Sequence, residues 1–293
     1  MASAELRQIQ RRIKSVQSTM KITRAMELIA ASRIVKAQQR VAAAQPYTKK
    51  MNEVVRNVAA ASGGASHPLL EHREVRTVGV LVVTSDRGLA GAYNSNVMRL
   101  AETRLIELKR SGVDLRVYAI GKKALGYFRY RGYQMERSFL GVTDTPGYGD
   151  ARAIANQLMN DYAEGKVDAV EVFSTFYLSA LTQKAESVPL LPIAPPERAG
   201  DEEQAPTAYT YEPSAQNILS RLLPRYVEAS TFGILLDASA SEHAARRRAM
   251  KAATENAEEL TRVLSREGNQ ARQAEITTEI SEIVGGAEAL TRG

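Results

Sequence analysis

Hydrophobic positions in the first sixty residues repeat with the spacing of a long helix. Residues 4–61 contain no glycine and a single proline, and strong helix formers predominate. Steps of three and four residues separate the apolar positions, as in a coiled-coil seam. The pattern predicts one helix of about 55 residues, roughly 80 Å long, with a kink at the proline. Its seam is Leu6, Ile9, Ile13, Val16 and Met20, then Met26, Ile29, Ala37, Val41 and Ala44, interrupted at Arg33; the proline is Pro46.

The carboxyl-terminal stretch shows the same spacing. Many of its seam positions are alanine, and small residues allow two helix axes to approach closely. We therefore predict that the two terminal helices pair as an antiparallel coiled coil. Gly268 interrupts the second helix and costs about 1 kcal/mol relative to alanine, unless a bend or a close contact requires it. The seam residues are Met250, Ala253, Ala257, Leu260 and Leu264, followed by Ile276, Ile280, Ile283, Ala287 and Leu290.

Between the two helices, the helical period gives way to runs of β-branched residues. Val78–Thr84 reads VGVLVVT, which is typical of a strand buried on both faces of a parallel sheet. Strands and helices that alternate in this way predict a small, doubly wound α/β domain. The further strands are expected over 115–120, 169–177 and 183–191, and the helices over 94–111, 122–131 and 150–164.

These patterns divide the chain into four segments. Residues 1–60 form the amino-terminal coiled-coil helix, and residues 75–195 form a Rossmann-like α/β domain. An acidic loop without apolar spacing, predicted to be mobile, occupies 196–208. Residues 209–293 complete the chain and end in the carboxyl-terminal coiled-coil helix.

Composition removes several classes of site. The absence of cysteine excludes disulfides and thiolate metal sites, and three scattered histidines leave little for an imidazole site, so we expect neither metal nor cofactor. No stretch approaches the roughly 18 apolar residues of a membrane span, and the first residues do not resemble a secretory signal, so we expect the chain in the cytoplasmic compartment. Residues 1–57 hold 12 Lys and Arg against 3 acidic residues, so their charge of +9 exceeds the +6 of the whole chain.

The turn after the first strand is the natural place for a phosphate-binding loop. Its sequence, TSDRGLAG over 84–91, fits neither common glycine-rich nucleotide motif. The preferred interpretation is a tight turn at Gly88 and Gly91, which Asp86 fixes by bonding to backbone amides. A Rossmann-like nucleotide-binding enzyme that carries a coiled-coil arm remains the alternative.

Two other functions find weaker support. Clustered arginines at 246–248 and the basic first helix suggest nucleic acid, but no aromatic residues lie between them for base stacking. The basic residues of the first helix are better explained by a solvated helix face, or by a face that meets an acidic protein surface, than by nucleic-acid binding. Two residue pairs could be read as acid-base groups, Asp237 with His243 and Ser85 with Asp86. Neither pair belongs to a Ser/His/Asp spacing or a paired-carboxylate pattern, so we expect no catalytic residue. Helices much longer than the domain between them favour a mechanical or scaffold protein.

Several blocks of the sequence resemble the γ subunit of bacterial F-type ATP synthase. The resemblance covers essentially the whole chain, and its blocks occur in the order of that family. They are RIKSV at 12–16, KITRAMELIAASR at 21–33, SDRGLAGAYN at 85–94, YEP at 211–213, SEHAAR at 241–246, MKAATEN at 250–256, ARQA at 271–274 and EIVGGA at 282–287.

The resemblance implies a central rotor shaft. The terminal helices would penetrate a ring of three α and three β subunits, with the α/β domain beside the ε subunit and a foot on the membrane-embedded c-ring. The shaft would couple proton flow through the c-ring to ATP synthesis or hydrolysis in the β subunits. The chain would then be a non-catalytic subunit, peripheral on the cytoplasmic side of the cell membrane, without a direct membrane span or a nucleic-acid partner.

The resemblance also assigns contact residues. It places Lys21, Arg24, Met26 and Arg33 near acidic loops of β, and it places Arg272, Gln273 and Thr277 near a catch loop of β. Tyr209, Tyr211 and Glu212 match the foot segment that touches the c-ring. Where the family commonly has an aromatic residue, Asn and a basic residue, this chain has Gly268-Asn269-Gln270, so one ring and one cation are missing.

Overall fold

The computed structural model describes residues 4–61, 67–194 and 214–291. Two compact units are present, a smaller one of Met1–Ala30 with Arg247–Gly293 and a larger one of Ala31–Arg246. Two long helices contribute to both units, α1 (Ala4–Ala61) and α5 (Ala215–Thr291). The other elements belong to the larger unit: the 3-10 turn η1 (Pro68–Leu70), β1 (Thr77–Val83), α2 (Tyr93–Arg110), β2 (Asp114–Ile120), α3 (Lys122–Tyr130), β3 (Met135–Phe139), α4 (Tyr148–Ala163), β4 (Ala169–Tyr177) and β5 (Gln183–Leu191).

A five-stranded sheet in the order β3-β2-β1-β4-β5 forms the centre of the larger unit. Strands β1 to β4 are parallel, whereas β5 runs antiparallel to β4. In the register, Val80 of β1 lies between Val117 of β2 and Glu171 of β4. The predicted α/β class is confirmed. Strand β3 escaped prediction because its sequence, MERSF, has two exposed charged residues and lies at the sheet edge, where burial does not select an apolar run.

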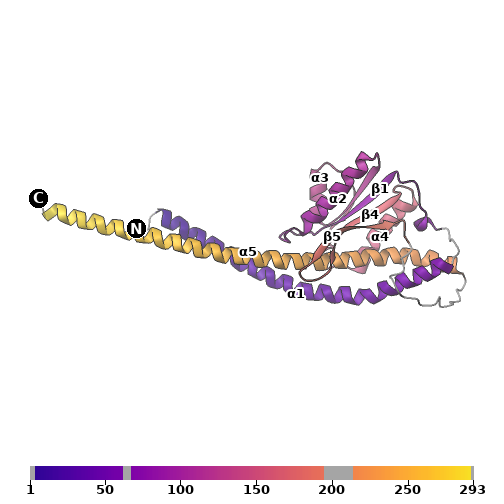
Figure 1. Ribbon diagram of the computed structural model, residues 1–293, viewed down its shortest axis with the longest axis horizontal. Helices are drawn as coiled ribbons and strands as arrows, with labels where there is room; N and C mark the ends of the chain where they lie inside the picture. Colours follow the sequence, from indigo (N-terminus) through magenta and orange to yellow (C-terminus); the bar gives the residue numbers. More distant parts are fainter. Residues whose placement is uncertain (1–3, 62–66, 195–213, 292–293) are drawn as a thin grey trace. The chain divides into compact units, whose positions relative to one another are not determined.

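Helices cover both faces of the sheet. On one face, Val97 and Leu105 of α2 and Phe128 of α3 pack against Val80 and Val82 of β1. The other face carries α4 together with the parts of α1 and α5 that belong to this unit (Figure 1).

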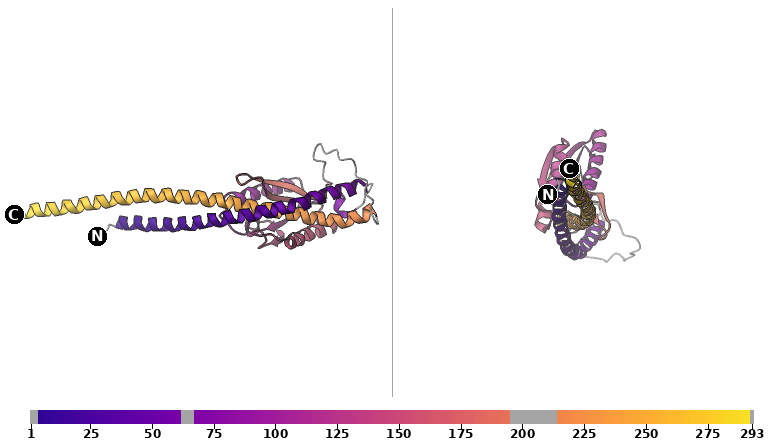
Figure 2. Two further views of the ribbon diagram at one scale, coloured as in Figure 1. Left: turned by 90° about the horizontal axis from the view of Figure 1, so that it is seen from below. Right: turned by 90° about the vertical axis from the view of Figure 1, so that its left-hand side faces the viewer.

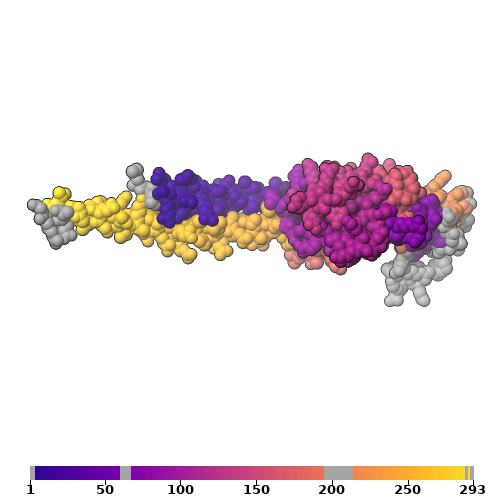
Figure 3. Space-filling view, turned by 90° about the horizontal axis from the view of Figure 1, so that it is seen from above, coloured from indigo at the N-terminus to yellow at the C-terminus, as the bar shows by residue number. Residues whose placement is uncertain are grey.

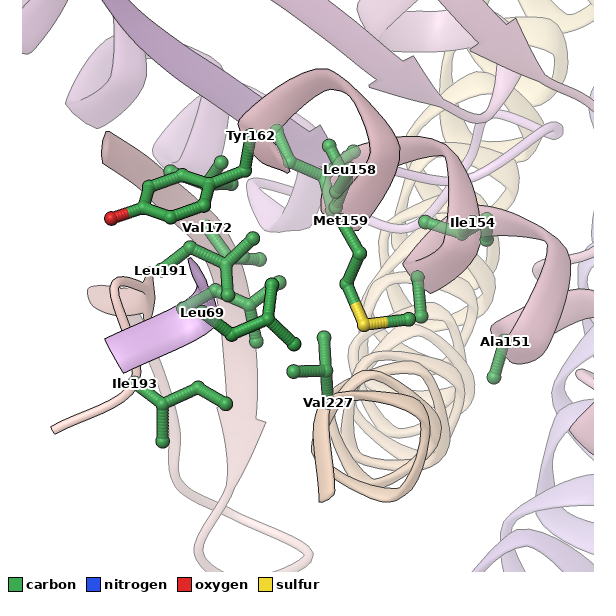
Figure 4. Packing of buried hydrophobic residues seen from close by; sticks show 14 of the residues in the cluster. Leu69, Ala151, Ile154, Leu158, Met159, Tyr162, Val172, Leu191, Ile193 and Val227 are labelled. Carbon is green, nitrogen blue, oxygen red and sulfur yellow. The ribbon is translucent and has the colours of Figure 1, made fainter. Parts of the chain in front are cut away.

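The second core includes residues from both long helices. Val227 of α5 lies beside Met159 of α4, close to Leu69 of η1 and Leu191 of β5 (Figure 4). Val55 and Val58 of α1 also belong to this cluster. Burial of apolar side chains is the main stabilising contribution to such a core. Because α1 and α5 both supply buried side chains to it, these parts of the long helices belong to the α/β domain.

The long helices continue through residues expected to interrupt them. Helix α1 contains Pro46 and α5 contains Gly268, and α5 also continues through Pro224, for which no break was predicted. The predicted interruption at Gly268 is therefore wrong, and the contact of this glycine with α1 has ordinary van der Waals length. A Cβ built on Gly268 would lie 3.4 Å from Cγ2 of Ile9 on α1.

The smaller unit is an antiparallel pair of helices, as predicted (Figures 1 and 2). Ile9 lies opposite Gly268, and Thr23 lies opposite Thr254, so numbers rise on α1 as they fall on α5. The predicted seam is out of phase in its inner part. Ile29 is 54% exposed, whereas its neighbour Ala30 is buried.

Candidate functional site

The turn after β1 is fixed by the side chain of Asp86. Its Oδ1 accepts from the backbone N–H of Lys122 at 3.1 Å, and its Oδ2 accepts from that of Gly141 at 2.9 Å. The hydroxyl of Thr143 donates to the same Oδ2 at 3.1 Å. This is the structural role that the sequence favoured for Asp86. Gly121 is required beside it, because at φ +88° a Cβ would lie 2.4 Å from the carbonyl oxygen of Thr84.

Helix α5 occupies the carboxyl edge of the sheet. In open α/β sheets, ligands bind at this edge, where the strand order reverses, which here is between β1 and β4. Ser241 of α5 donates its hydroxyl proton to the carbonyl of Thr175 in β4, at 3.2 Å. Arg246 of α5 donates to the carbonyl of Gly88, in the turn after β1, at 3.3 Å. Side chains of α5 thus cover this edge of the sheet and bond to its backbone.

A charged cluster lies at the same edge. Arg33 of α1 contacts both carboxylate oxygens of Asp144, and Arg246 pairs with the buried Glu242 at 2.7 Å. The Nε2 of His243 lies 3.3 Å from the backbone carbonyl of Asp144 and 3.8 Å from its Oδ1. Because a carbonyl can only accept, the tautomer with the proton on Nε2 satisfies this contact.

Three members of this cluster are the metal-binding candidates of the described residues. Ligand atoms of Asp144, Glu242 and His243 lie within 4.8 Å of one another, and Oε2 of Glu242 and Nδ1 of His243 have no hydrogen-bond partner. Each carboxylate, however, already has an arginine as its counter-ion. The two guanidinium groups neutralise the two carboxylates, so the net negative charge that attracts a cation is absent.

Burial shifts the pKa values of groups on this part of α5. Loss of solvation raises the pKa of Glu242, and the charge of Arg246 partly offsets the shift. Desolvation lowers the pKa of His243, which favours the neutral imidazole. It also raises the pKa of Asp237 from 3.8 to about 6. These shifts reflect insertion of α5 into the larger unit.

The structure places three of the predicted contact residues on one stretch of α1 in the smaller unit. Lys21 and Arg24 are exposed, and Met26 is partly buried. Arg24 pairs with Glu27 at 3.2 Å on the same helix, but its side chain remains 62% exposed. Lys21 also lines an open groove with Met20 and residues 258, 261 and 262 of α5. The two cations are therefore displayed side by side on the helix.

Helix α5 continues past the start of α1 (Figure 3). The other predicted contact group lies near that point, since Gly268 faces Ile9 and the group follows Gly268 on α5. Arg272, Gln273 and Thr277 are all exposed. About 16 residues of α1 separate Lys21 from the end of the helix pair, which corresponds to roughly 24 Å, so the structure does not bring the two groups together. The hydroxyl of Thr277 donates to the carbonyl of Gln273 at 2.9 Å. Apolar side chains are exposed beside them at Ile276 and beyond them at Ile280, Ile283 and Val284.

The other residues predicted to contact partner subunits are Arg33 and the foot segment. Arg33 faces Asp144 of its own chain, and its contact with a partner subunit stays a prediction. Tyr209, Tyr211, Glu212 and the predicted acidic loop 196–208 lie outside the described residues. Sequence reasoning missed Asp144, since a lone aspartate in a loop without periodicity gives no signal.

Comparison with known proteins identifies the family. A sequence profile described as ATP synthase matches residues 5–290. The ATP synthase gamma chain of Acidothermus cellulolyticus is 50% identical, with 98% of this chain and 97% of the relative covered. This chain belongs to the ATP synthase gamma chain family. The gamma chain of Streptomyces coelicolor is 47% identical over 98% of this chain and 96% of its own length.

Two solved structures contain a chain that shares this fold. A chain from the Euglena gracilis mitochondrial ATP synthase, in a structure described as OSCP/F1/c-ring, matches with a TM-score of 0.68 at 17% identity, with 98% of this chain and 94% of that chain covered. A chain from the central stalk and c-ring of the Tetrahymena thermophila enzyme gives a TM-score of 0.59 at 21% identity, with 79% and 99% covered. Among the described residues, no helix combines the length and the apolar character that crossing a membrane requires.

Proposed function

We propose that this chain is the central rotor shaft of an F-type ATP synthase, on the cytoplasmic side of the cell membrane. The observation that carries the proposal is the match to gamma chains of bacteria over 98% of the chain at up to 50% identity. Solved relatives of the same fold come from ATP synthase central stalks. The shaft couples rotation of the proton-driven c-ring to ATP synthesis or hydrolysis in the β subunits.

The exposed residues of the smaller unit supply the contacts with the catalytic head. Lys21 and Arg24 present two cations that suit acidic loops of β, with Met26 beside them. Arg272, Gln273 and Thr277 engage a second loop of β near the end of α5. The contacts of an asymmetric shaft differ among three identical β subunits, and that difference in free energy holds each β subunit in a different conformation.

The remaining partners follow from the same assignment. The ε subunit binds beside the α/β domain, and Tyr209, Tyr211 and Glu212 contact the c-ring. Together these contacts make the chain a peripheral component of a membrane-bound complex.

Reconstitution tests this function. The purified chain is combined with α and β subunits of the Acidothermus cellulolyticus enzyme, and a probe is attached at Tyr130→Cys. That position is 87% exposed, and the natural chain has no cysteine, so labelling is specific. We expect no ATPase activity from the chain alone and ATP-driven rotation of the probe in the complex.

A truncated chain that lacks residues 264–293 serves as the companion variant. We expect it to assemble with lower turnover, because it has lost Arg272, Gln273 and Thr277. A complete complex that hydrolyses ATP without turning the probe would refute the shaft function. Equal turnover after truncation would instead remove only the proposed contact near the end of α5.

A further inference from the structure

Asp144, in the loop between β3 and α4, is held by both long helices. From α1, the Nη1 of Arg33 donates to both carboxylate oxygens, with 2.5 Å to Oδ2. From α5, the hydroxyl of Ser239 donates to the backbone carbonyl of Asp144 at 3.2 Å, and His243 contacts the same carbonyl. One loop residue therefore connects two helices that are far apart in the sequence.

Other side chains of α1 and α5 also form hydrogen bonds to this part of the α/β domain. Arg40 of α1 donates to the carbonyl of Pro146 in the same loop, and Gln38 donates to the hydroxyl of Tyr177 at the end of β4. From α5, Ser241 and Arg246 bond to carbonyls at the carboxyl edge of the sheet. Both helices are thus fixed to this edge by directional polar bonds, in addition to apolar packing.

These contacts lie where the two helices leave the larger unit. Arg33 is three positions from its boundary on α1, and Arg246 is its last residue on α5. Force that passes along either helix must enter or leave the larger unit here. The apolar contribution of α1 close to this point comes from Ile34 and Ala37. The two hydrogen bonds from Nη1 of Arg33 to the carboxylate are directional and charge-assisted, whereas contacts of small apolar side chains have no preferred direction.

We propose that Asp144 is a positioning residue, the centre of a brace that makes the α/β domain turn together with α1 and α5. The brace consists of Arg33, Asp144, Ser239, His243 and Arg246. This inference rests on the proposed shaft function. Without the brace, the α/β domain lags behind the helices under load, and part of the rotation is lost as elastic twist.

The first experiment needs only the isolated chain. Spin labels are placed at Lys36→Cys on α1 and Tyr130→Cys on α3, both exposed positions. Double electron-electron resonance then gives the distribution of distances between them. We expect Arg33→Gln to give a distribution of roughly twice the width, and Arg33→Lys to restore most of the original width by keeping the charge.

Arg104 provides a matched control. Its guanidinium forms a fork to Glu171, at 2.7 Å for the closest atoms, and the two pairs have similar exposure. It joins α2 to β4, and the carboxylates that it pairs with, Glu171 and Glu107, lie on neither long helix. We expect Arg104→Gln to leave the distribution unchanged. An unchanged width in Arg33→Gln, or equal broadening in both variants, would overturn the brace.

The second experiment connects the brace with rotation. In the complex with α and β, the angular fluctuation of a probe at Tyr130→Cys is recorded while the shaft is stalled. We expect wider fluctuation for Arg33→Gln than for the natural chain and for Arg104→Gln. Equal fluctuation in all three would show that the brace carries no torque. A complex with the natural chain that never rotates would refute the shaft function. The distance distributions from the spin labels would then still test the brace, because they are measured on the isolated chain.

Discussion

The hydroxyl oxygens of Thr23 and Thr254 lie 2.7 Å apart, across the seam between α1 and α5. Each hydroxyl is also close to a carbonyl of its own helix, that of Met20 at 3.0 Å and that of Met250 at 2.9 Å. Both threonines are buried. A buried polar pair is satisfied in only one alignment of the two helices, so this contact selects the register of the smaller unit.

Replacing one of these hydroxyls should destabilise the helix pair. We expect Thr254→Val to lower the free energy of unfolding by about 1 kcal/mol, because the cross-helix hydrogen bond is lost. Adding Thr23→Val should cost less than the sum of the single changes. Urea unfolding of the full chain measures both. Thr278→Val is the control, because Thr278 is exposed and bonds only within its helix. Strict additivity would show that the hydroxyls do not interact.

Gly268 should accept a methyl group and reject a larger side chain. We expect Gly268→Ala to stabilise the chain by about 0.5–1 kcal/mol through helix propensity, since the added Cβ would be in contact distance of Ile9. Gly268→Leu should destabilise it, because the larger side chain must displace α1. Thermal unfolding compares both with Gly285→Ala, at an open position of the same helix. A destabilising alanine would mean that the seam is tighter than these distances imply.

Asp237 should weaken the fold at neutral pH. Its pKa of about 6 in the folded chain exceeds its ordinary value of 3.8, because burial disfavours the charge. Between these values the folded chain holds a proton that the unfolded chain has lost, so this contribution to stability grows as the pH falls through 6 and is complete below 3.8.

We therefore expect Asp237→Asn to stabilise the chain at pH 7 by about 1 kcal/mol, after allowance for partial solvent screening. The advantage should disappear at pH 4. Urea unfolding at the two pH values checks this, with Glu258→Gln at an exposed position as the control. A gain of the same size at both pH values would show that the charge is not its cause.

Arg272 should contribute to turnover without contributing to the fold. Its side chain is exposed at the end of the helix pair. We expect Arg272→Gln to lower ATP hydrolysis by the reconstituted complex roughly fivefold, which corresponds to about 1 kcal/mol of lost contact with a carboxylate. Arg266→Gln, at another exposed position of α5, should have little effect. Comparable loss in both variants would indicate general electrostatics instead of a specific contact.

Local patterns in the sequence determined most of the elements. The run at Val78–Thr84 predicted β1, because a strand covered on both faces has no polar position. The spacing of three and four residues predicted both terminal helices. Blocks of residues along the chain identified the family. All of this information is local, since periodicity reports which residues avoid water.

The tertiary structure decided which residues meet. The sequence predicted Ile29 in the seam, yet Ile29 is exposed, and a buried pair of threonines holds a seam position nearby. Pattern analysis treats threonine as a surface residue, because its hydroxyl can be buried only when a partner is present. Arg33 and Asp144 are separated by 111 positions, and no local signal joins them. Their pairing arises because the α/β domain folds between two helices that are distant in sequence.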